Sequence, residues 1–237
     1  MRIDKLLSNT GFGSRKEVKG LLKKGGVTVN SELIKDGKRQ IDPSEDHIEV
    51  FGEVIEYKPF IYLMMNKPKG VISATEDVTD KTVVDLLATE HALYDPFPVG
   101  RLDKDTTGFM LLTNDGKLAH QLTSPKKKVD KTYRVHIDAP LTSADEASLI
   151  AGVELDDGYI TKPAKLTYGN DNTVIFLTIT EGKFHQVKRM FQALGRKVIN
   201  LKRETIGPLK LDPSLLLGEY RELTDEEVAG LREQNKS

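Results

Sequence analysis

The sequence predicts an α+β protein. We expect a small basic front domain, residues 1–58, and a larger domain, residues 59–237, with a mixed, mainly antiparallel sheet flanked by helices. The first 40 residues contain ten Lys and Arg against four Asp and Glu, and the stretch "IDPSEDHIEVFGEVIEY" then reverses the sign. From Ile61 onward, strand-like apolar runs alternate with short helical segments without a regular βαβ rhythm. This pattern favours an α+β domain over a parallel one.

The composition limits the classes of function. The 237 residues have a net charge of -1 and include no cysteine, which excludes disulfides, thiolate zinc sites and cysteine nucleophiles. No stretch approaches the roughly 18 apolar residues of a membrane span. The beginning, "MRIDKLLSNTGFG", lacks the apolar segment of a signal peptide. The five histidines form no spaced metal motif. We therefore expect a cytoplasmic protein with no metal, no cofactor, no membrane association and no obligate protein partner.

The front domain is predicted to contain two short helices and a strand, in the segment "MRIDKLLSNTGFGSRKEVKGLLKKGGVTVN". Apolar side chains at helical spacing define the inner faces, with Ile3, Leu6 and Leu7 in the first helix and Val18, Leu21 and Leu22 in the second. Ser14 is the expected N-cap of the second helix, and Gly25 with Gly26 ends it. The alternating residues 27–30, "VTVN", then predict a short strand.

Basic side chains occupy the outer surface of this segment. They are Arg15, Lys16, Lys19 and Lys23 on the second helix, with Arg2 and Lys5 on the first. A row of cations on one helix suits contacts with nucleic-acid phosphates. The alternative is a solvated helix face that binds nothing.

Five stretches predict the regular elements of the larger domain. They are a strand, a Lys-Pro-Lys-Gly turn and a second strand in 61–73; a strand, an Asn-Asp-Gly turn and a helix in 109–123; strands in 131–137 and 172–183; and a helix in 184–195 that ends at Gly195.

The stretch "FPVGRLDKDTTG", residues 97–108, clusters Arg101, Asp103, Lys104 and Asp105 where a strand is expected to end. An ionised aspartate in a loop stiffened by its neighbours is a candidate nucleophile or general base. A structural turn is the alternative. A second alternative is the D-x-D-x-[TV] loop of Mg²⁺-dependent haloacid-dehalogenase-like phosphatases. That loop follows a buried parallel strand, whereas "VGRL" places Gly and Arg there.

Two further stretches contain candidate site residues. Tyr133 lies on the strand "KTYRV", where packing in the core is the alternative to a role in a site. The stretch "EGKFHQVKRM" places His185, Lys188 and Arg189 near the start of a helix. Cations at that position oppose the helix dipole, which predicts that a carboxylate or an external anion compensates them.

Taken in order, these motifs resemble a known family. "RIDKLL", "SRKEVKGLLKKG" and "VTVN" are similar to the S4 RNA-binding domain, over about Met1 to Glu56. "NKPKG", "FPVGRLDKDTTGFMLLTNDG", "KKKVDKTYRV" and "EGKFHQVKRMFQALG" follow it. The whole resembles the RsuA-like pseudouridine synthases, enzymes that isomerise uridine in ribosomal RNA, over about Met1 to Leu223. "DTTG" and "LTSPKKKVDKTY" look like the branch that acts on small-subunit (16S) RNA.

The resemblance implies a role for each candidate residue. Asp103 is the nucleophile, Tyr133 stacks on the target uracil, and Lys188 pairs with the aspartate at a position where arginine is frequent. Arg101 is expected to fill the vacated base stack or to contact phosphate. Arg189, about 100° round the helix from Lys188, is expected to point elsewhere, toward RNA phosphate.

The resemblance also implies the substrate and leaves alternatives open. The expected partner is ribosomal RNA, either 16S RNA or an assembling small subunit. The reaction needs no redox step and no group donor. Alternatives are a synthase for large-subunit RNA and a non-catalytic assembly factor that binds ribosomal RNA. The resemblance does not distinguish attack by Asp103 at C1′, attack at C6 and removal of a ribose proton.

Overall fold

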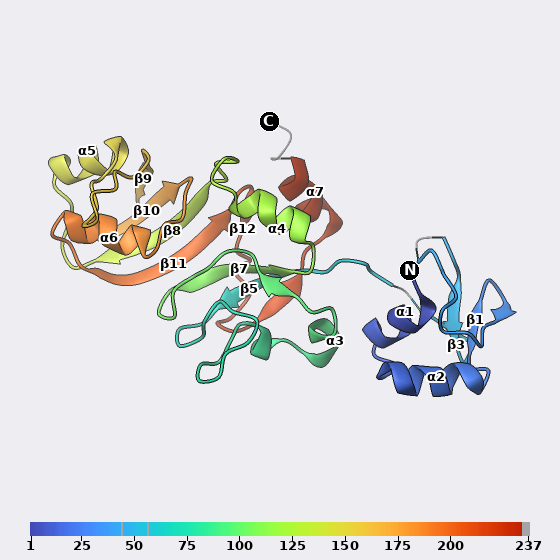
Figure 1. Cartoon of the computed structure of the whole chain (residues 1–237). Coiled ribbons are helices and arrows are strands. Elements are labelled where there is room, and N and C mark those ends of the chain that lie inside the picture. The colour runs from blue at the N-terminus through green and yellow to red at the C-terminus, as the bar shows by residue number, and fades with distance from the viewer. Residues whose placement is uncertain (44, 56, 234–237) are drawn as a thin grey trace. The chain divides into compact units, whose positions relative to one another are not determined.

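A computed structural model describes residues 1–43, 45–55 and 57–233. The chain folds into two compact units (Figure 1). The first comprises Met1–Ile61 together with Leu87–Pro96, and the second comprises Tyr62–Leu86 and the described chain from Phe97 onward. The short segment Leu87–Pro96, with the helix α3 (Thr89–Ala92), therefore groups with the first unit rather than with the larger one. No described helix is long and apolar enough to cross a membrane.

The first unit begins with the two predicted helices, α1 (Ile3–Asn9) and α2 (Arg15–Lys23). A four-stranded antiparallel sheet of order β2-β1-β3-β4 follows, made of β1 (Val27–Val29), β2 (Glu32–Leu33), β3 (Ile48–Val50) and β4 (Glu53–Val54). The expected N-cap is confirmed, because the Ser14 hydroxyl accepts from the Glu17 amide and the Glu17 carboxylate accepts from the Ser14 amide.

One apolar core holds the first unit together. Ile3, Leu6 and Leu7 of α1 and Val18 and Leu22 of α2 are buried in it, while Leu21 is partly buried against it. Each fully buried side chain of this size contributes about 1.5–3 kcal/mol. The inner faces expected from helical spacing are thus confirmed. The cationic residues fall on the opposite, exposed surface.

The second unit is built on a nine-stranded mixed sheet. Its main path has the order β13-β5-β7-β11-β8-β10-β9, with β12 paired to β11 and β6 paired to β7. The strands are β5 (Tyr62–Lys67), β6 (Phe97–Pro98), β7 (Thr107–Thr113), β8 (Lys131–Ile137), β9 (Lys165–Tyr168), β10 (Val174–Ile179), β11 (Val198–Ile206), β12 (Leu209–Lys210) and β13 (Tyr220–Glu222). Every pair of strands is antiparallel except β7 with β11, so the predicted mixed, mainly antiparallel sheet is confirmed.

The parallel contact between β7 and β11 is short and requires a glycine. It pairs Lys202 with Thr107 and Arg203 with Gly108. Gly108 has φ +102°, and a Cβ on it would lie 2.3 Å from the carbonyl oxygen of Arg203. The last glycine of "DTTG" therefore lets two strands approach closely beside the candidate site.

Helices lie at both ends of this sheet (Figure 1). They are α4 (Gly116–Thr123), α5 (Ser143–Ala151), α6 (Gln186–Ala193) and α7 (Asp225–Glu233), with a 3₁₀ turn at Val84–Leu86. Helices α4 and α7 pack on one core with β5 and β7, to which they contribute Leu118, Ala119, Leu122 and Leu231. Helices α5 and α6 contact β9 and β11.

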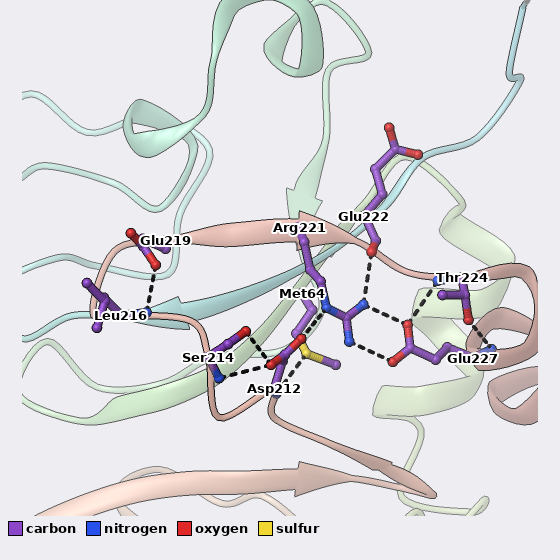
Figure 2. Close-up of polar contacts among 9 residues, drawn as sticks. All are labelled: Met64, Asp212, Ser214, Leu216, Glu219, Arg221, Glu222, Thr224 and Glu227. Carbon is purple, nitrogen blue, oxygen red and sulfur yellow. Dashed lines mark hydrogen bonds and ion pairs between the residues drawn. The ribbon is translucent and has the colours of Figure 1, made fainter.

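An arginine fastens the C-terminal segment onto the sheet (Figure 2). Arg221 on β13 donates to Asp212 at 2.7 Å and makes two bonds to Glu227 of α7, at 2.8 and 2.9 Å. Hydrogen bonds from Ser214 and from Arg221 lower the pKa of Asp212 to about 2. Because β13 pairs with β5, this cluster also supports the strand that ends at Lys67.

Two local predictions were wrong. The second strand expected at the end of 61–73 does not form, and only an isolated bridge joins Ile72 to Thr82. The side chain of Ser73 instead bonds to the backbone of Leu102. The helix expected from residue 184 begins at Gln186, because His185 before it is in the left-handed conformation with φ 49°.

Candidate active site

A cleft of about 1110 Å³ lies in the second unit. Its floor includes side chains from three neighbouring strands, namely Lys131 and Tyr133 of β8, Ile179 of β10, and Leu201 and Arg203 of β11. Its walls include the loop with Arg101 and Asp103 and the segment 180–187 before and at the start of α6. The cleft therefore collects the three stretches that sequence analysis singled out.

Asp103 lies in the loop between β6 and β7, before β7 begins at Thr107. The strand before it, β6, has only two residues and pairs antiparallel with β7. A buried parallel strand, which the phosphatase alternative requires, does not precede the loop. The Asp103 side chain is 25% exposed, so its carboxylate can be reached from the cleft.

The loop that carries Asp103 is held by a buried lysine. Lys67 is fully buried, and its ammonium donates to the carbonyl oxygens of Asp103 at 3.0 Å, Thr106 at 2.9 Å and Pro68 at 3.1 Å. Burial lowers the pKa of Lys67 to about 8, and the carboxylates of Asp103 and Asp105 oppose that shift. Sequence analysis missed this role, because "NKPKG" has the composition of an exposed basic turn.

Lys188 bridges the two aspartates of the loop. Its Nζ lies 2.8 Å from Oδ2 of Asp103 and 2.5 Å from Oδ1 of Asp105. Partial burial lowers the pKa of Lys188, but the hydrogen bonds it donates to these carboxylates outweigh burial and hold the pKa above its ordinary value. The same bond lowers the pKa of Asp105. The predicted compensation of cations at the start of α6 by carboxylates is confirmed.

Arg189 points away from Lys188, as expected, but it is neutralised by protein groups. Its guanidinium forms ion pairs with Asp156 and Asp157, and Nε donates to Asp156 at 2.6 Å. The side chain is only 16% exposed. These two carboxylates are its partners in the protein without RNA, and its contact with RNA phosphate stays a prediction.

A buried glutamate sets the start of α6. Glu181 accepts hydrogen bonds from the Tyr159 hydroxyl at 2.7 Å, the Lys162 amide at 3.0 Å and the Gln186 side chain at 2.7 Å. Gln186 is the first residue of α6. This network therefore fixes the helix that presents Lys188 to Asp103.

Tyr133 lies on the floor of the cleft and is 8% exposed. It is paired in register with Leu177 of β10 and Arg203 of β11. Arg203 is itself buried, and its Nε donates to the carbonyl of Phe109 at 2.8 Å. Lys131 is on the same strand as Tyr133, and burial lowers its pKa to about 8. The aromatic ring thus stands among cations at the base of the cleft.

The remaining predicted residues are exposed. Arg101 lies at the cleft and has no recorded ion pair among the described residues. In the first unit, Lys5, Arg15, Lys16, Lys19 and Lys23 are exposed, while the exposed Arg2 pairs with Asp4 at 2.5 Å. Among the described residues, no group of three or more His, Asp or Glu side chains is placed to hold a metal ion.

Comparison with known proteins agrees with this fold. Residues 61–193 match the RNA pseudouridylate synthase family, and residues 1–47 match the S4 domain. The RNA pseudouridine synthase YtzG of Bacillus subtilis is 56% identical over 98% of this chain and 99% of its own. The ribosomal small subunit pseudouridine synthase A of Vibrio vulnificus is 45% identical over 96% of this chain and 98% of its own.

A solved structure of a pseudouridylate synthase is 38% identical, with a TM-score of 0.69 over 98% of this chain and 99% of that one. The chain belongs to the RsuA-like RNA pseudouridine synthases and begins with an S4 domain. It is therefore an isomerase that acts on RNA.

Proposed function

We propose that this enzyme converts one uridine of 16S ribosomal RNA to pseudouridine, with Asp103 as the nucleophile. The observation that carries the proposal is the Asp103–Lys188 contact at 2.8 Å inside the cleft. Lys188 compensates the charge of this carboxylate inside the cleft, and an aspartate carboxylate is a group that can act as a nucleophile. The substrate is proposed because relatives at 37–45% identity over nearly the whole chain are named ribosomal small subunit pseudouridine synthase A. Such a substrate implies a cytoplasmic enzyme.

The reaction breaks the N1–C1′ bond of uridine, turns the base and joins C5 to C1′. The proton on C5 is lost and N1 gains one, so no external group is consumed. Asp103 acts on the target nucleotide while the N1–C1′ bond of that nucleotide is broken. Lys188 compensates the negative charge of the Asp103 carboxylate. The target base must first leave its stack, which costs a few kcal/mol. Arg101, exposed at the cleft, is the residue we assign to the vacated stack or to a flanking phosphate.

The proposed substrate is tested by mapping pseudouridine after reaction with total ribosomal RNA and with partly assembled small subunits. Carbodiimide treatment followed by primer extension marks each pseudouridine as a stop. We expect one new stop in 16S RNA. A stop only in large-subunit RNA would reject the proposed branch. Tight binding with no stop in either RNA would favour the non-catalytic assembly factor.

Tyr133 is proposed as the platform for the flipped uracil. Stacking on an aromatic side chain is worth about 1–3 kcal/mol per base, so Tyr133→Leu should slow pseudouridine formation by roughly fivefold to 150-fold. Tyr133→Phe keeps the ring, and no hydrogen bond of the hydroxyl is recorded among the described residues. We expect Phe to stay within about threefold of wild type in single-turnover assays. Equal loss in both variants would contradict a stacking role.

The cationic face of α2 is proposed to grip RNA phosphates. The double variant Lys16→Glu and Lys19→Glu should weaken RNA binding about tenfold and lower the slope of log affinity against log salt by roughly 2. Lys38→Glu, an exposed lysine of the same unit outside α2, is the matched control. Filter binding between 50 and 200 mM salt, about the range where phosphate contacts dominate, measures both quantities. An unchanged salt slope would leave α2 as a solvated face.

A further inference from the structure

Phe184 is an aromatic side chain that the fold leaves exposed at the wall of the cleft. It is 70% exposed, compared with 39% for Tyr168, the other large aromatic that is exposed in the second unit. Leaving such a ring in water forgoes the roughly 1.5–3 kcal/mol that burial would provide. Single exposed apolar residues are common, so the surroundings of Phe184 decide whether its exposure has a use.

The neighbour of Phe184 fixes the orientation of its ring. The His185 imidazole stacks on the Phe184 ring with centroids 3.8 Å apart and planes at 19°. His185 has a left-handed backbone, φ 49°, which is unfavourable for a non-glycine residue. His185 Nε2 lies 3.5 Å from Oδ1 of Asp103. The two stacked rings, here called the column, therefore place the edge of the imidazole near the candidate nucleophile and leave Phe184 exposed to solvent.

The stretch around this column is held by hydrogen bonds and has two lysines nearby. Gln186 bonds to buried Glu181 and to the amide of Lys183, which closes the turn that contains Phe184. The exposed Lys183 places its ammonium 4.5 Å above the Tyr159 ring. Lys162 also lines the cleft. A flat apolar face beside fixed cations suits a nucleotide, because the base can stack while its phosphate meets the lysines.

We propose that the open face of Phe184 stacks on an unpaired nucleobase adjacent to the target uridine in the RNA chain. The proposal rests on the proposed function, which places the target base inside the cleft on Tyr133. Tyr133 is buried on the floor, while Phe184 is exposed at the wall. With the target base inside, the neighbouring nucleotide is the one that meets this wall. Phe184 thus requires an unpaired base beside the target uridine, whichever base it is, because every base has a π face.

The test compares Phe184→Ala, Phe184→Leu and Phe184→Tyr on an RNA fragment that contains the mapped uridine, taken from whichever subunit it lies in. Loss of one stacked base corresponds to roughly a fivefold to 150-fold loss of affinity. We expect Phe184→Ala to raise KM about tenfold with kcat within about twofold. Phe184→Tyr should restore KM, whereas Phe184→Leu, which keeps apolar bulk without a π face, should not. Ile199→Ala, a 49% exposed residue on β11 away from the cleft lining, is the control.

A fluorescent base reports the contact directly. The same RNA is made with 2-aminopurine on the 5′ or the 3′ side of the uridine. Binding of wild-type enzyme should quench one of the two probes through stacking, and Phe184→Ala should remove that quenching. Unchanged KM in Phe184→Ala, or equal KM in the Leu and Tyr variants, would overturn the inference. A target in large-subunit RNA would reject the proposed substrate and leave the comparison of Phe184 variants intact.

Discussion

Asp103→Asn should reduce pseudouridine formation by at least about 10³-fold while RNA binding stays within about twofold of wild type. Asparagine has the same shape as aspartate but carries no charge, so the Lys188 ammonium loses a carboxylate that lies 2.8 Å away. The loop itself should keep its conformation, because Lys67 and Ser73 bond to its backbone. These bonds do not involve the Asp103 side chain. The rate is measured by single-turnover conversion on the mapped RNA, and binding is measured separately on the same RNA.

Asp105→Asn is the matched control for this prediction. Asp105 also contacts Lys188, at 2.5 Å, but its side chain is 70% exposed. Exposed ion pairs are worth about 0–1 kcal/mol, so we expect less than about a fivefold change in rate. Equal losses in the two variants would mean that the charge balance around Lys188, rather than a nucleophile at Asp103, governs the rate.

Lys67→Met should destabilise the catalytic unit by about 2 kcal/mol, which corresponds to a melting temperature lower by about 6 °C. The substitution removes the ammonium donor from the carbonyl oxygens of Pro68, Asp103 and Thr106, although the Asp103 carbonyl still accepts from the Thr106 amide at 3.0 Å. An unsatisfied buried carbonyl costs about 1–3 kcal/mol. Removal of the charge returns part of this loss, since a pKa of about 8 for Lys67 corresponds to a net cost of roughly 3 kcal/mol for keeping this side chain charged in the folded protein.

The loss of these bonds should also slow the reaction. A shift of about 1 Å in a reacting group can cost around 10²-fold in rate, and two of the three carbonyls belong to the loop that carries Asp103. Lys69→Met, the same substitution on the exposed lysine of the same turn, should change neither quantity. Thermal unfolding at pH 7 measures the stability of each variant, and single-turnover assays measure its reaction rate. A Lys67→Met protein as stable and as active as Lys69→Met would contradict the assigned role.

Local pattern was sufficient to predict most elements of the fold. The strand 131–137 and the inner faces of the first two helices follow from side-chain periodicity, and periodicity is a property of neighbouring residues. The cap at Ser14 follows from the same local chemistry. The dipole argument predicted that a carboxylate or an external anion compensates the cations at the start of this helix, but it could not say which groups do so. Four aspartates were found there, two paired with Lys188 and two with Arg189.

Long-range contacts decided the rest. Lys67 has the same residue type and almost the same sequence surroundings as Lys69, yet one is fully buried under the loop of Asp103 and the other is exposed. The second strand expected in 61–73 does not form, and Ser73 contacts Leu102 instead.

The column of Phe184 and His185 depends on the turn closed by Glu181 and Gln186. The sequence alone determined the family, the order of elements and the candidate residues, because these are written in local motifs. Burial and partners were set only when residues distant in the chain came together, because a side chain's environment is created by the tertiary fold.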